Sequence, residues 1–221
     1  MTYNRYSYCL NNPLKYKDPT GNKYVKNDDI WDVDRNGNVV GFTKNEKFDQ
    51  IRVVDENKNV LAETDKFKFG TIKHNKPSAL VEGVLKALDI FGVKGDNNAT
   101  QVFEMLHNNT NVEWTHAQIG REGSESNIVG TSHNRTSTIV GNYLLETGYT
   151  LRDVTHNHHN NNPMPSGLRV FEETGVRTKD LFSAELYQNK FPNINLNIYT
   201  TDYKYSPYNK YGTLDLRLIK K

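Results

Sequence analysis

The sequence lacks several features that would fix its cellular setting. No run of about 18 apolar residues occurs among its 221 residues, which argues against a transmembrane helix. The first residues after Met1 include no apolar segment of the kind a classical signal peptide needs. The single cysteine, Cys9, cannot form an internal disulfide. The net charge is +2, from 28 Lys and Arg against 26 Asp and Glu, and it neither demands nor forbids nucleic acid.

Aromatic residues are plentiful, although the chain is polar. Hydrophobic residues make up 35% and the mean hydropathy is −0.77, but aromatics reach 11%, with 13 tyrosines. This aromatic content argues against disorder, and the length suffices for one substantial core or for a domain with an appendage. We therefore predict a soluble, ordered domain.

The first 21 residues differ from the rest of the chain. They contain three short motifs: Tyr6-x-Tyr8, Asn11-Asn12-Pro13-Leu14 and Asp18-Pro19-x-Gly21. Together these motifs resemble the end of the core region of RHS-repeat proteins, in which a variable toxin domain follows a large β-shell. The resemblance implies that the natural polypeptide extends upstream and that the RHS shell is a partner of this chain.

Residues 22–75 alternate apolar and polar side chains in short runs, which predicts β-hairpins. Residues 30–42 and 51–62 each consist of two such runs around a polar turn, so they form an imperfect duplicated hairpin. Asp34 and Asp55 take equivalent places in the two turns. We predict a β-hairpin meander here, which could serve delivery, contact the RHS shell or bind substrate.

Residues 76–221 mix helical and strand patterns, which predicts an α+β fold. Helices are expected from Pro77 to about Ile90, after a cap at residues 96–98, and over residues 138–147 and 179–190. Strands are expected over residues 112–120, 126–131, 151–158, 194–199 and 212–218. The predicted domains are therefore 1–21, 22–75 and 76–221.

The richest chemical cluster is Thr155-His156-Asn157-His158-His159. His156 and His158 are two residues apart, so at the end of a strand their imidazoles project from one face and could bind one zinc ion. By the same rule His159 lies on the opposite side. Taken alone, a His-x-His pair in an Asn-rich chain is more often a polar surface loop.

Other residues add a pattern to this pair. Glu113 lies in a predicted strand that ends at Gly120, Ser166 follows His158 by eight positions, and Asp180 begins a predicted helix. This order resembles the JAMM (MPN-type) zinc metalloprotease signature over about residues 112–200. The chain is most similar to the divergent JAB-like toxin domains attached to RHS cores. The resemblance implies a mixed β-sheet flanked by helices.

The resemblance also implies a role for each residue. His156, His158 and Asp180 are the zinc ligands, and they leave the fourth tetrahedral position open for water. Glu113 is the general base, and Ser166 donates a hydrogen bond to the oxyanion of the tetrahedral intermediate. The implied activity is zinc-dependent hydrolysis of a peptide or isopeptide bond.

Two departures from the signature stand out. His159 occupies the place of a proline that normally follows the second histidine. The aspartate should come three residues after the serine, where this chain has Arg169, so an insertion of about residues 168–177 has to loop out before Asp180. Glu172 or Glu173, within the insertion, could take the third ligand place instead.

The remaining candidate residues are expected to have structural roles. His116 and Asp153 are three positions from Glu113 and His156 on their strands, so each should face away from the site. His74, His107 and His133 are isolated in the sequence and are predicted to be structural.

Two other functions compete with the protease. The first is an RHS-associated metal-dependent nuclease, because a His-His-Asn cluster can serve such a site. The histidines all lie on one predicted element, however, and no basic stripe runs through the domain. The second is a catalytically inactive JAMM-like binding module, which the displaced aspartate favours.

Toxin function implies further expectations. We expect an exported interbacterial effector that acts in the cytoplasm of the target cell, where it cleaves a protein substrate. We also expect a cognate immunity protein that covers or distorts the site. The identity of the substrate and that of the immunity protein are not encoded in these motifs.

Overall fold

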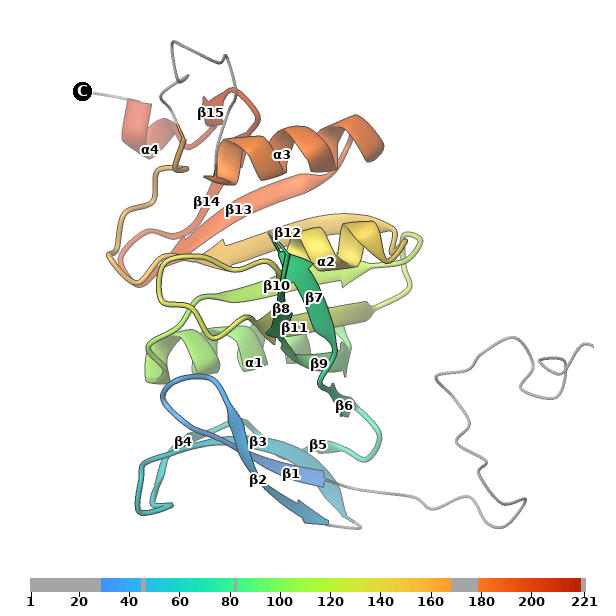
Figure 1. The fold of residues 1–221 in the computed structure, drawn as a ribbon, viewed down its shortest axis with the longest axis vertical. Helices are drawn as coiled ribbons and strands as arrows, with labels where there is room; N and C mark the ends of the chain where they lie inside the picture. Colours follow the sequence, from blue (N-terminus) through green and yellow to red (C-terminus); the bar gives the residue numbers. More distant parts are fainter. Residues whose placement is uncertain (1–28, 45–46, 82, 168–178, 220–221) are drawn as a thin grey trace, which may run out of the picture.

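A computed structural model describes residues 29–44, 47–81, 83–167 and 179–219. The proposed RHS-like motifs and the insertion of about residues 168–177 lie outside these residues. Figure 1 shows a large sheet with helices on both faces and a smaller sheet beside α1. None of the helices in the described ranges is long and apolar enough to cross a membrane.

The large sheet has eight strands in the order β15-β14-β13-β12-β10-β11-β9-β6. They are β6 (Ile72–Asn75), β9 (Asp89–Lys94), β10 (Trp114–Ile119), β11 (Ser126–Thr131), β12 (Leu151–Asn157), β13 (Asn195–Thr200), β14 (Lys204–Asn209) and β15 (Gly212–Thr213). The central strand β12 is antiparallel to β10 and parallel to β13, so the sheet is mixed. Its helices are α1 (Asp96–Asn109), α2 (Val140–Glu146), α3 (Lys179–Lys190) and α4 (Leu216–Ile219). The predicted α+β fold is confirmed.

The small sheet contains the two predicted hairpins. It runs β2-β1-β3-β4, with β5 also paired to β3. Its strands are β1 (Asp29–Val33), β2 (Val39–Lys44), β3 (Phe48–Val54), β4 (Val60–Glu63) and β5 (Phe67–Lys68). The hairpins associate through parallel pairing of β1 with β3, so consecutive strands are not always neighbours. The last strand of the region 22–75, β6, pairs with β9 of the large sheet.

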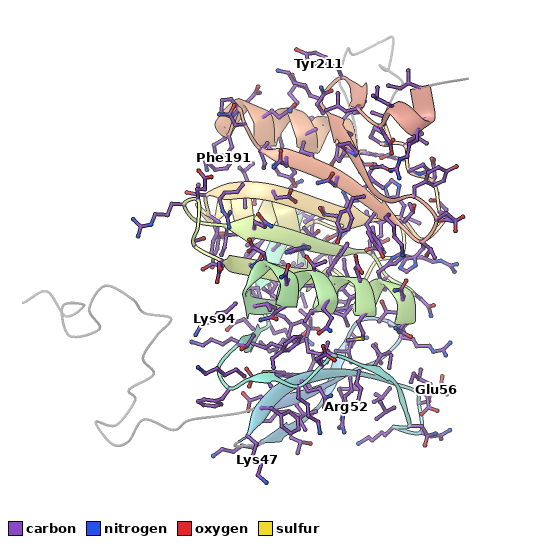
Figure 2. The ribbon with its side chains drawn as sticks, turned by 180° about the vertical axis from the view of Figure 1, so that it is seen from behind. Lys47, Arg52, Glu56, Lys94, Phe191 and Tyr211 are labelled. Atoms are coloured by element: carbon purple, nitrogen blue, oxygen red, sulfur yellow. The ribbon has the colours of Figure 1, made fainter. Side chains whose placement is uncertain are left out.

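Two hydrophobic clusters hold the layers together. One joins the small sheet, α1 and one face of the large sheet through Trp31, Ile51, Phe103 and Trp114. The other packs α2 and α3 on the opposite face. Figure 2 shows the molecule from behind, with Arg52 on the small sheet. The small sheet thus shares its core with the large one.

The predicted helix from Pro77 to Ile90 is wrong. This segment forms the hairpin of β7 (Ser78–Val81) and β8 (Val84–Ala87) and then enters β9. Gly83 adopts φ +79° beside the turn, a conformation that interrupts a helix. Leu80 and Leu85 pair across the hairpin with exposed fractions of 66% and 72%, so they do not form a buried helical face. The apolar run fitted a period of two as well as a helical period.

The other predicted elements are largely confirmed. β11 and α3 match their expected bounds, and α1, β10, α2, β12 and β13 match within two residues where bounds were predicted. The helix α1 begins after Gly95, which makes no side-chain cap, and Asp96 lies in its first turn. At the C-terminus the predicted strand 212–218 is confirmed only over β15, because Leu216 starts the short helix α4.

Candidate metal centre

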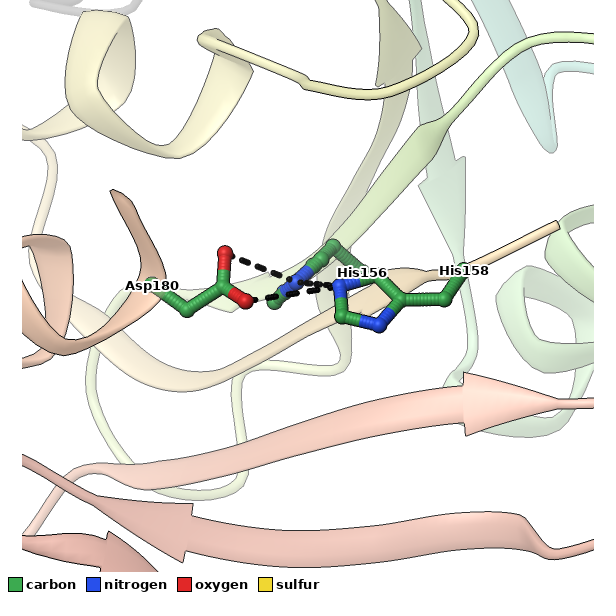
Figure 3. A group of neighbouring side chains, drawn as sticks. All are labelled: His156, His158 and Asp180. Carbon is green, nitrogen blue, oxygen red and sulfur yellow. Dashed lines mark hydrogen bonds and ion pairs between the residues drawn. The ribbon is translucent and has the colours of Figure 1, made fainter. Parts of the chain in front are cut away.

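His156 lies near the end of strand β12 and His158 directly follows the strand; the two side chains lie on the same side, as the two-residue spacing at a strand end predicts. Their Nε2 atoms are 3.1 Å apart. Asp180, in the first turn of α3, directs its carboxylate at both rings (Figure 3). Its Oδ1 lies 3.3 Å from His156 Nε2, and its Oδ2 lies 3.4 Å from His158 Nε2. The fold therefore brings together three potential ligands from two elements that are distant in sequence.

This group has the chemistry of a metal site. Two imidazole nitrogens and a carboxylate oxygen are common ligands of catalytic zinc. One potential ligand atom from each of the three residues lies within 4.8 Å of the other two, so a single ion could contact all three residues. The Nδ1 of His158 lies 2.8 Å from the carbonyl oxygen of Asn162, to which it donates its proton. That hydrogen bond leaves the Nε2 lone pair of His158 free for a metal.

Ser166 holds the Asp180 carboxylate in place. Its backbone N–H and its hydroxyl each donate to Oδ2 of Asp180 at 2.7 Å. The neighbouring histidines hold the pKa of Asp180 well below its usual range, although burial alone would raise it. One hydroxyl proton cannot serve Asp180 and an oxyanion at the same time, so the oxyanion role of Ser166 stays a prediction.

Glu113 lies directly before β10 and is buried, with an exposed fraction of 5%. Burial raises the pKa of its carboxyl to about 7. His156 and His158 oppose this rise, and Asp180 adds to it. A carboxyl group with a pKa near neutrality can take up and release a proton under ordinary conditions. The pKa of His156 is raised: burial opposes the charged form, but the carboxylates of Asp180 and Glu113 outweigh burial.

A cavity of about 750 Å³ contains all these groups. Glu113, the three potential ligands and Ser166 line it. The loop between β11 and α2 contributes Arg135 and residues 136–138 to another part of the wall, and Phe182 of α3 adds an apolar surface. A substrate segment that entered the cavity would meet the metal group and Glu113 together.

The structure also accounts for the weaker candidates. His116 packs against Phe103 of α1 and contacts Asn127 of β11, and Asp153 accepts a hydrogen bond from Thr155, so both point away from the metal group as predicted. Within the described residues, the one cluster with metal-ligand spacing is formed by His156, His158 and Asp180. Glu172 and Glu173 lie outside those residues.

The three histidines that appear isolated in the sequence have partners in the fold. His74 and His133 flank the buried carboxylate of Asp89, with nitrogen–oxygen distances of 2.6 and 3.2 Å. These histidines, with Lys76, hold the pKa of Asp89 well below its ordinary value, although burial opposes this. His107 stacks on His159 at a ring distance of 5.2 Å. No spacing rule could have found these pairs, because each joins different elements.

Comparison with known proteins identifies the central part of the chain. Residues 91–185 match the family model described as JAB-like toxin 1, a span that includes Glu113, the three potential metal ligands and Ser166. Neither the curated proteins nor the solved structures yield a match. The small sheet lies outside the matched span. Residues 91–185 are therefore similar to JAB-like toxin domains.

Proposed function

We propose that this toxin domain is a zinc-dependent hydrolase that cleaves peptide or isopeptide bonds in proteins of a target cell. The observation that carries the proposal is the convergence of His156, His158 and Asp180 in one cavity with the buried Glu113. A buried carboxyl whose pKa lies near neutrality, in one cavity with three potential metal ligands, has the properties that a general base requires. The nuclease alternative has no comparable support.

Each residue has a defined task in this proposal. His156, His158 and Asp180 hold the zinc ion, and the hydrogen bonds of Ser166 and of the Asn162 carbonyl keep the ligands oriented. When bound, zinc supplies Lewis-acid chemistry, which polarises a carbonyl group and lowers the pKa of water. Glu113 takes the proton from the attacking water and later gives it to the leaving amine. Burial keeps Glu113 out of bulk solvent and raises its pKa to about 7, so it can carry a proton near pH 7.

The cellular setting follows from the toxin family and from the motifs at the N-terminus. We propose an exported effector that is released from an RHS shell and acts in the cytoplasm of another bacterium. Its partners would be that shell, a protein substrate and a cognate immunity protein. The cavity mouth is the surface that such an inhibitor has to cover, because it gives the substrate access to Glu113.

The decisive experiment compares Glu113→Gln and His156→Ala with the wild-type protein. New protein N-termini are counted in a bacterial lysate, and zinc is measured in each purified protein. We expect the wild type to bind one zinc ion and to generate new termini. Glu113→Gln should keep the zinc and lose the cleavage, whereas His156→Ala should lose both. Full cleavage by Glu113→Gln would overturn the mechanism, and degradation of plasmid DNA or RNA by the wild type would favour the nuclease.

A further inference from the structure

Two side chains next to the potential ligands point to the opposite side of β12. Asn157 is fully buried between His156 and His158, and its Oδ1 accepts a hydrogen bond of 2.5 Å from the backbone N–H of Trp114. His159 lies two residues beyond the strand, and its Nε2 is 2.6 Å from the carbonyl oxygen of Val112. Both contacts go to the segment that contains Glu113, one on each side of it.

This segment lies beyond the last residue pair that joins β10 to β12, which is Thr115 with His156. Its backbone groups therefore bond elsewhere. The N–H of Glu113 donates to the carbonyl oxygen of Asn134 at 2.8 Å, and its own carbonyl oxygen accepts from the Thr131 hydroxyl at 2.7 Å. Together with the bonds of Asn157 and His159, these hydrogen bonds occupy four successive backbone groups: the carbonyl oxygen of Val112, the N–H and carbonyl oxygen of Glu113, and the N–H of Trp114.

The direction of each hydrogen bond follows from the partners. A carbonyl oxygen only accepts, so His159 must carry its proton on Nε2. A backbone N–H only donates, so the oxygen of Asn157 faces Trp114 and its Nδ2 points to Nδ1 of His107, 2.8 Å away. His107 must then be neutral, and burial, aided by His159, lowers its pKa to about 4. In this arrangement Nδ2 of Asn157 and Nε2 of His159, which are 3.3 Å apart, are both donors and do not bond to each other.

We propose that Asn157 and His159 are positioning residues that hold Glu113 in register with His156 and His158. In residues 156–159, the side chains of His156 and His158 are then the potential ligands, and those of Asn157 and His159 position the base, Glu113. Misplacement of a catalytic group by about 1 Å can lower the rate about 100-fold, so the position of Glu113 relative to the two histidines matters for catalysis. It also explains why His159 stands where the resembled signature has proline, since proline has no ring N–H to donate to Val112. The proposal rests on the proposed role of Glu113 as the base.

The test compares His159→Leu, which removes the donor, with His159→Gln, whose amide can replace it. Val53→Ala, in the core of the small sheet, serves as the control for general destabilisation. We expect His159→Leu to cleave lysate proteins about 10- to 100-fold more slowly, with unchanged zinc affinity, and His159→Gln to recover most of the rate. In the metal-free protein, amide exchange at Glu113 and Trp114 should quicken in His159→Leu and in Asn157→Leu, but not in His159→Gln or Val53→Ala.

Equal exchange at these two amides in all variants would overturn the positioning role, whatever the activity. Equal loss of rate in the Leu and Gln variants, or a loss of zinc affinity that matches the loss of rate, would also overturn it. If Glu113→Gln cleaves like the wild type, the proposed function fails instead, and the exchange measurement still decides whether Asn157 and His159 order the segment.

Discussion

The two turns of the small sheet have the same local structure but different surroundings. In the first, Asp34 Oδ1 accepts from the N–H groups of Asn36 and Asn38, each at 2.8 Å. In the second, Asp55 Oδ1 accepts from those of Asn57 and Asn59, at 2.9 and 2.8 Å. The fourth residue of each turn has a positive φ, 79° for Gly37 and 63° for Lys58. The duplicated hairpin predicted from the sequence is confirmed at this level of detail.

The difference lies in what each turn touches. The first turn docks on the large sheet, where the Arg35 carbonyl oxygen accepts from the Asn111 N–H at 2.7 Å. A Cβ atom on Gly37 would lie 2.7 Å from Cγ2 of Val112, the residue before Glu113. In the second turn, Lys58 is exposed. Both positions adopt the left-handed conformation, but only the docked turn also requires a residue without a side chain. The comparison shows that the glycine is required by packing as well as by backbone conformation.

The largest effect is expected when alanine is placed at the fourth position of each turn. Gly37→Ala should lower the free energy of unfolding by about 3–4 kcal/mol, because the new Cβ overlaps Val112 and adopts an unfavourable φ. Lys58→Ala, the matched control, should leave it nearly unchanged. Chemical denaturation measures both. Similar values for the two variants would show that the first turn is not packed against the large sheet.

The next effect concerns Glu113, which directly follows Val112, the residue next to Gly37 of the docked turn. In the folded, metal-free protein its pKa is about 7, compared with an ordinary value of 4.5. Between these values the folded state keeps a proton that the unfolded chain releases, so raising the pH destabilises the fold. Glu113→Gln should remove this slope and gain about 3 kcal/mol over the wild type above pH 7, with little gain below pH 4. A constant difference across the pH range would contradict the raised pKa.

A smaller effect is expected from the aspartates. Asp34→Ala removes two backbone hydrogen bonds and the Oδ2 contact with Nδ2 of Asn38, and it should cost about 1–2 kcal/mol. Asp55→Ala removes the equivalent bonds in an exposed turn, so its cost should be smaller. Amide exchange at Asn111 should increase in Asp34→Ala alone, since that amide bonds to the docked turn. An increase in both variants would mean that the two turns are coupled.

The smallest effect is a gain in stability. Lys58→Gly relieves a non-glycine residue of its left-handed conformation and should stabilise the protein by about 0.5–1 kcal/mol. The thermal unfolding midpoint should rise by a few degrees. A fall in the midpoint would show that the Lys58 side chain makes a stabilising contact in its turn.

Sequence periodicity predicted the elements that carry the site better than those around it. The spacing of His156 and His158 on a strand fixed their common face, and Asp180 was placed at the start of α3, where it lies. The same reasoning gave a helix where β7 and β8 form a hairpin, because Leu80 and Leu85 can satisfy either period. Local patterns therefore predict an element correctly where only one periodicity fits the residues, and they can mislead where a strand period and a helical period both fit.

The sequence by itself determined the α+β class, the two aspartate turns and the histidine pair at the end of β12, since each follows from the alternation of side chains or from bonds within a few residues. Only the tertiary structure decided that Asp180 meets both histidines, that Ser166 holds Asp180, and that Asn157 and His159 bond on either side of Glu113. These contacts join residues from 14 to 47 positions apart. Their geometry depends on how whole layers pack, which no local pattern encodes.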